Sequence, residues 1–276
     1  FNWQDVYRIA DPYTLPQGTS VSMRFTYNNS ADNPRNPNAP PVRVRAGNRS
    51  SDEMAHLQLQ VRPKSTSDLV LLRESLYRDA LLKRPDNPWN YYGLGNVLWE
   101  QNQLNSAVTQ YEAGLEVDPT HAPMRNNLGA VLETQGRAEE AASQFREAIR
   151  LDPNFADAHY NYGNTLLTLG QNDQAIQQYR DTLRLEPNHA EAHANIGYAY
   201  QQQGALSDAI RHYRDAVRLR PESAQALNNL GSALAMSGAF TEAIDLFEQT
   251  LVKDPGHSQA RENLELAREL EQENSR

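Results

Sequence analysis

The sequence predicts a mainly α fold, a right-handed α-solenoid of helical hairpins, preceded by a small antiparallel β segment that forms a partial β-sandwich. Two observations predict this arrangement. Residues 88–257 repeat with a period of 34 residues, which is typical of stacked helical hairpins. Residues 1–62 instead alternate apolar and polar side chains with a period of two, the pattern of half-buried strands.

Several residue types keep the period of 34. The recurring positions are Gly95, Gly129, Gly163, Gly197 and Gly231; Pro85, Pro119, Pro153, Pro187, Pro221 and Pro255; Ala107, Ala141, Ala175, Ala209 and Ala243; and the aromatic residues Tyr77, Tyr111, Phe145, Tyr179, Tyr213 and Phe247. We predict that the glycines lie inside the first helix of each hairpin, where a side chain would hold the second helix away. A second set, Gly136, Gly170, Gly204 and Gly238, is predicted to take the positive φ of a helix C-cap.

The order Leu128-Gly129, Ala141, Phe145, Ala148 and Pro153 resembles the motif of the tetratricopeptide repeat family. The resemblance implies five full repeats, at 88–121, 122–155, 156–189, 190–223 and 224–257, and a protein-binding function. The fourth position, usually Trp in the family, holds Tyr91, Arg125, His159, His193 and Leu227. We predict a linker and half-repeat helix at 63–87, and a C-terminal capping helix at 258–276.

Residues 1–62 contain the segments that carry a second resemblance: Phe1–Gln4, Leu15–Thr19, Tyr27–Pro34 and Ser51–Met54. These segments resemble the C-terminal half of the copper type II ascorbate-dependent monooxygenase family as it appears in bacterial fusions. The resemblance implies a periplasmic or extracellular location and makes Met54 one copper ligand. The histidine ligands of that copper lie upstream of the matching segment, before Phe1. We therefore expect an incomplete copper site that binds no copper.

Composition excludes several kinds of function. The formal net charge of −9 argues against a nucleic-acid or anionic-membrane partner, because both require a basic face. No apolar run approaches the roughly 18 residues of a membrane helix, so we predict no membrane span. The absence of cysteine excludes disulfides and thiolate metal sites. Five of the seven histidines, His121, His189, His257, His159 and His193, occupy repeat positions that we interpret as packing positions. We expect no metal site, no cofactor and no enzymatic activity.

A peptide-binding site is predicted on the first helix of each repeat, which lines the concave surface of such solenoids. Its amides are Asn127, Asn161, Asn195, Asn229 and Asn263, spaced 34 residues apart. An amide both donates and accepts hydrogen bonds and so matches a peptide backbone. The asparagines resemble those that hold an extended peptide in the tetratricopeptide array of O-linked N-acetylglucosamine transferase. The alternative is that they bond to the backbones of neighbouring helices and stiffen the stack. An aromatic end of the groove is predicted from Trp89, Tyr92, Asn96 and Trp99, with Tyr160.

Three functions follow from these patterns, and we favour the first. The chain is a scaffold that binds an extended peptide or a partner domain on its concave surface. Alternatively, it is a structural protein that assembles with copies of itself, as an oligomer or filament, through β-edge and solenoid-end contacts. The third function is the docking arm of a truncated copper monooxygenase.

Overall fold

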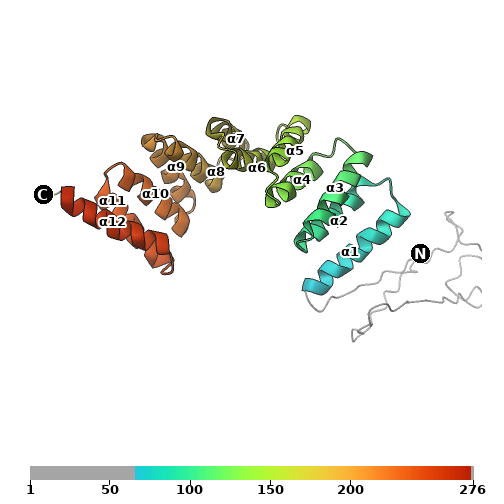
Figure 1. Cartoon of the computed structure of the whole chain (residues 1–276), viewed down its shortest axis with the longest axis horizontal. Helices are drawn as coiled ribbons and strands as arrows, with labels where there is room; N and C mark the ends of the chain where they lie inside the picture. Colours follow the sequence, from blue (N-terminus) through green and yellow to red (C-terminus); the bar gives the residue numbers. More distant parts are fainter. Residues whose placement is uncertain (1–65, 275–276) are drawn as a thin grey trace, which may run out of the picture. The chain divides into compact units, whose positions relative to one another are not determined.

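The computed structural model describes residues 66–274, with side chains from residue 69 onward. This part of the chain consists of helices, with no strand among the described residues (Figure 1). The prediction of a helical solenoid preceded by a β segment is therefore corrected to an all-helical fold over this range. The physical reason is that the period-two pattern is confined to residues 1–62, whereas the described range carries the helical period. The predicted strands lie outside the described residues.

The described helices form five hairpins between two single helices. Helix α1 (Thr66–Lys83) comes first and α12 (Ser258–Asn274) comes last. The hairpins are α2 (Pro88–Glu100) with α3 (Leu104–Val117), α4 (Ala122–Thr134) with α5 (Ala138–Leu151), α6 (Ala156–Thr168) with α7 (Asn172–Leu185), α8 (Ala190–Gln202) with α9 (Leu206–Leu219), and α10 (Ala224–Met236) with α11 (Phe240–Lys253). The first helix of a hairpin is called helix A below, and the second helix B.

The stacking of the hairpins distinguishes the two helix types. Each A helix contacts the A helix of the next hairpin, from α2 against α4 through α8 against α10, and α10 contacts α12. Successive B helices, among those described, make no such contact with one another. Because only the A helices approach one another, the stack of hairpins curves with its A helices on the inner, concave side.

Gly163 shows why helix A carries a glycine where it crosses helix B. A Cβ atom added there would lie 2.6 Å from Cε1 of the buried Tyr179. The equivalent glycines, Gly95, Gly129, Gly197 and Gly231, would meet the aromatic ring of their own helix B in the same way. Gly170 has a φ of +72°, as the C-cap prediction requires. Both predictions for the recurring glycines are confirmed.

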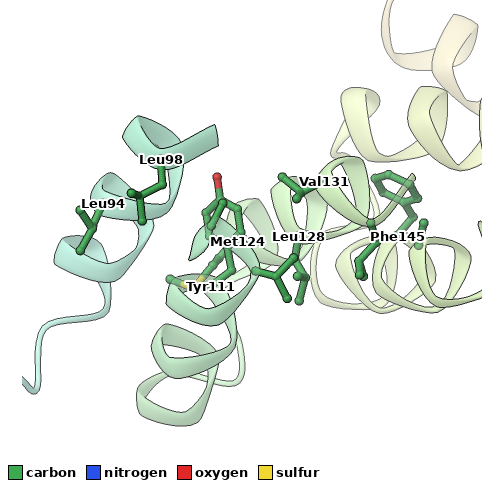
Figure 2. Packing of buried hydrophobic residues seen from close by; sticks show 11 residues of the cluster. Leu94, Leu98, Tyr111, Met124, Leu128, Val131 and Phe145 are labelled. Atoms are coloured by element: carbon green, nitrogen blue, oxygen red, sulfur yellow. The ribbon is translucent and has the colours of Figure 1, made fainter. Parts of the chain in front are cut away.

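The apolar core runs from one hairpin into the next, as Figure 2 shows for the first two hairpins. Side chains from four helices form one buried cluster there, including Leu94, Leu98, Tyr111, Met124, Leu128, Val131 and Phe145. A hairpin in such an array buries its apolar face against its neighbours, so its stability depends on them. No helix within residues 66–274 has the length and apolar character needed to cross a membrane.

Candidate functional site: the concave surface of the A helices

Asn195 joins two A helices through a network of side-chain hydrogen bonds. From α8, its Nδ2 atom donates to Asn164 Oδ1 (2.8 Å) and to the hydroxyl of Tyr160 (3.4 Å), both on α6. Asn164 Oδ1 also accepts from the hydroxyl of Tyr179 on α7, at 2.8 Å. The same network recurs two repeats earlier, where Asn127 donates to Asn96 (2.8 Å) and Tyr92 (3.3 Å), and Tyr111 donates to Asn96 (2.6 Å).

Two further asparagines of the predicted set also link consecutive A helices, with fewer hydrogen bonds. Asn161 on α6 donates to Asn126 Oδ1 on α4, at 3.0 Å. Asn263 on α12 donates to α10, where it reaches Asn228 Oδ1 (3.3 Å) and Ser232 Oγ (3.1 Å). Four of the five predicted asparagines therefore use their Nδ2 atoms to hold consecutive A helices together. This agrees with the alternative that the asparagines stiffen the stack, except that they bond to side chains and not to the backbone.

Asn229 on α10 differs from the other four. The acceptor positions on the preceding A helix, 35 and 31 residues earlier, hold Ala194 and Tyr198 instead of an amide or hydroxyl within reach. Asn229 Oδ1 accepts from Gln225 Nε2 on its own helix, at 2.7 Å. Its Nδ2 atom has no hydrogen-bond partner among the described residues. Tyr198, at the repeat position equivalent to Asn164, is 47% exposed. The junction of α8 and α10 therefore offers a half-buried amide and an exposed aromatic ring.

The predicted aromatic end of the groove is partly assembled. Trp89 is 59% exposed and lies against Tyr92 and His121, with ring centroids 5.9 and 4.4 Å away. Trp99 packs instead against the core of the first hairpins. Tyr160 belongs to another junction, where its ring lies 4.6 Å from that of His189.

The recurring histidines cap helices, a role that the sequence analysis missed. Nδ1 of His121 accepts a hydrogen bond from the backbone N–H of Met124, the third residue of α4. His189 and His257 make the same bond to α8 and α12, and Ser223 makes it to α10 from the same repeat position. Serine at this position is a common helix N-cap and could have indicated the role. Burial lowers the pKa of His121, which favours the neutral imidazole that can accept this bond.

Two other histidines face each other inside one hairpin. Nδ1 of His193 on α8 and Nδ1 of His212 on α9 are 3.2 Å apart. Burial, together with the charge of His193 and of nearby arginines, lowers the pKa of His212 to about 4. No group of three or more His, Asp or Glu side chains is arranged to hold a metal ion in residues 69–274. Met54, the predicted copper ligand, lies outside the described residues.

Charge separates the two helix types. The A helices α2, α4, α6, α8 and α10 contain five charged residues in all, and α10 contains none. The B helices α3, α5, α7, α9 and α11 contain twenty. Of the charges on the A helices, Glu100 pairs with Arg73 and Glu191 with Arg220. The concave surface is therefore composed mainly of amides, aromatic rings and small apolar side chains.

Three family models describe this array. One model of the tetratricopeptide repeat matches residues 92–156 and 196–258, and a second matches residues 145–177. A TPR repeat model matches residues 163–204. Together they run without a gap over residues 92–258, more than half of the chain. The chain belongs to the tetratricopeptide repeat family. The matches begin at residue 92, so the resemblance of residues 1–62 to the copper monooxygenase family finds no support.

Several solved structures share this fold. YrrB is described as a TPR protein with an unusual peptide-binding site. It is 24% identical to this chain with a TM-score of 0.59, and the match covers 67% of this chain and 96% of YrrB. MamA is 23% identical with a TM-score of 0.57, over 61% and 92%. PilF of Pseudomonas aeruginosa is 18% identical with a TM-score of 0.57, over 70% and 90%. No curated protein sequence matches the chain.

Proposed function

We propose that this TPR array is a non-enzymatic protein-interaction scaffold that binds an extended, largely uncharged peptide segment along its A helices. The observation that carries the proposal is the contrast in charge between the A and B helices. A surface of amides and aromatic rings suits a peptide backbone and apolar side chains, and it offers no cluster of cations for an acidic motif. The peptide-binding site named for YrrB supports the same class of ligand.

The centre of the proposed site is the junction of α8 and α10. The Nδ2 atoms of Asn127, Asn161, Asn195 and Asn263 already donate to the neighbouring helix. A ligand there would have to replace an internal bond or use the amide oxygen alone. The Asn229 Nδ2 atom requires no such exchange, and Tyr198 presents an exposed ring on which a ligand side chain can pack.

Binding of labelled peptides to single variants tests this proposal. The full chain is screened by fluorescence polarisation against uncharged, acidic and basic twelve-residue peptides, and the tightest binder is kept as the probe. Asn229→Ala removes one donor and one acceptor, each worth about 0.5–1.5 kcal/mol. We expect it to weaken binding about tenfold and to leave the melting temperature unchanged.

Asn195→Ala is the matched control. It makes the same chemical change one repeat earlier, where the amide bonds to Asn164 and Tyr160. We expect it to lower the melting temperature more than Asn229→Ala does, and to weaken binding less. Equal loss of affinity in the two variants, or a preference of the full chain for charged peptides, would contradict the proposed site.

Self-association into an oligomer or filament stays a prediction. The described surfaces that it would use are the exposed leucines of the two end helices, which are Leu69, Leu71, Leu76 and Leu82 on α1 and Leu266 and Leu270 on α12. Sedimentation of the full chain checks it, and a monomer at all concentrations would exclude it. The periplasmic or extracellular location also stays a prediction, to be checked by fractionating the source cells.

A further inference from the structure

His121 carries a buried hydrogen-bond donor that has no acceptor in the described part of the chain. The imidazole is 6% exposed, and its Nδ1 atom accepts the capping bond from the backbone N–H of Met124, at 3.1 Å. Because Nδ1 must be unprotonated to accept this bond, the neutral ring carries its proton on Nε2. Nε2 has no hydrogen-bond partner within residues 69–274. A buried donor without a partner costs free energy, which a ligand with a suitable acceptor would recover.

Two aromatic rings lie beside this donor. The centroid of the imidazole is 4.4 Å from that of Trp89 and 5.2 Å from that of Tyr92. Trp89 and Tyr92 come from the first turns of α2, and His121 caps the start of α4. The Trp89 side chain makes no hydrogen bond with the described residues and is 59% exposed. Its ring can therefore turn to uncover Nε2 without breaking a bond.

The cluster of Trp89, Tyr92 and His121 belongs to the concave surface. Trp89 holds the repeat position of Gln225, whose amide bonds to Asn229 on that surface, at 2.7 Å. The hydroxyl of Tyr92 accepts from Asn127, at 3.3 Å, which leaves its O–H group to donate. The next three repeats hold Pro123, Asp157 and Glu191 at the position of Trp89. The aromatic cluster is therefore particular to the junction of α2 and α4.

We propose that Trp89, Tyr92 and His121 bind a proline-rich segment of a partner protein, which packs on the Trp89 ring and offers a backbone carbonyl to Nε2 of His121. This inference rests on the proposed peptide-binding function and adds a second subsite, three repeats before the junction of α8 and α10. The polar groups left without a partner here are N–H and O–H donors. Proline lacks a backbone N–H, and its extended helix leaves the carbonyls exposed. Aromatic-lined grooves bind such segments in other proteins.

Asp118 favours a neutral acceptor over an anionic one. Burial lowers the pKa of His121, and the carboxylate of Asp118 is near enough to oppose that shift. Hydrogen bonds from the hydroxyl and the backbone N–H of Thr120, at 2.7 and 2.9 Å, hold the pKa of Asp118 below its usual range. This negative charge would repel a ligand carboxylate. The acceptor that suits Nε2 is therefore a neutral carbonyl, such as a proline-rich backbone presents.

Fluorescence polarisation of two labelled peptides with the full chain tests this subsite. Proline alternates with alanine in one peptide, and glycine replaces proline in the other, so length and charge are equal. Trp89→Ala removes the exposed ring. His121→Ser removes the ring donor but keeps a cap, because Ser223 caps α10 from the same repeat position. His189→Ser is the matched control, two repeats later, where Asp157 stands at the position of Trp89.

We expect the full chain to bind the proline peptide about tenfold more tightly than the glycine peptide, because the proline peptide is already extended. Trp89→Ala should weaken binding of the proline peptide about tenfold and His121→Ser about fivefold, whereas His189→Ser should leave it unchanged. Circular dichroism of each variant checks that the helices remain intact.

Equal affinity of the full chain for the two peptides would overturn the proline-rich subsite, and so would equal losses in His121→Ser and His189→Ser. Either result leaves the proposed function standing if Asn229→Ala still weakens binding of the probe selected from the uncharged peptides. Loss of that effect as well would overturn both.

Discussion

Gly163 offers a quantitative test of how the hairpins pack. An ordinary Gly→Ala change inside an exposed helix stabilises it by about 1 kcal/mol. Here the new Cβ would lie 2.6 to 2.9 Å from three ring atoms of Tyr179. The Tyr179 ring is fully buried, and its hydroxyl bonds to Asn164, so the ring cannot move without losing that bond. Overpacking of this kind costs about 1–3 kcal/mol. We expect Gly163→Ala to lower the free energy of unfolding by about 1 kcal/mol net.

A double-mutant cycle isolates the steric contact. Gly163→Ala is measured by chemical denaturation in the native background and again in the background of Tyr179→Leu, which removes the ring. In the second background the alanine should become neutral or stabilising. Stabilisation by Gly163→Ala in the native background would refute the close approach of the two helices on which the packing argument rests.

Two further predictions follow from the caps and the buried tyrosines. His189→Ala should cost about 1 kcal/mol of stability because the first turn of α8 loses its cap. His189→Ser should be tolerated, because Ser223 caps α10 from the same repeat position. Equal melting temperatures for the two variants would contradict this prediction. Burial raises the pKa of Tyr111, Tyr179 and Tyr213 in the folded chain. The unfolded chain should therefore release these phenol protons first, from about pH 10 upward. The free energy of unfolding should then fall as the pH rises above that value. Absorbance at alkaline pH, read with and without denaturant, measures this difference, and titration of all tyrosines together in the folded state would exclude it.

The helical hairpins could be predicted because their rules are local to one repeat. Every hairpin has a glycine at the position of Gly163 and an aromatic residue at the position of Tyr179. Both positions lie within one repeat of 34 residues, so the period alone indicates their contact. The positive φ of Gly170 follows in the same way from its place after helix A. The β segment had no comparable support, because residues 1–62 lack a repeat against which the period-two pattern could be checked.

The role of the asparagines could not be read from the period. The bond partners of Asn195 lie 31 and 35 residues earlier, on another helix, and those positions vary between repeats. Asn164 and Tyr160 supply acceptors at one junction, while Ala194 and Tyr198 supply none at the next. The recurrence of asparagine every 34 residues therefore predicts where the amide lies, but it does not predict the group to which the amide bonds.

The repeat at 190–223 departs from its neighbours at two positions, and the proposed binding site depends on one of them. At its junction with α10, Ala194 and Tyr198 leave the Asn229 amide without the bonds that its equivalents make. Inside its own hairpin, His212 stands where the two preceding repeats have Gln144 and Gln178, and so creates a pair of facing imidazoles. In a repeat array, residues that keep the period are explained by the packing that every hairpin shares. Residues that break the period while leaving a polar atom without an internal partner have no such explanation, and they mark the positions where binding should first be measured.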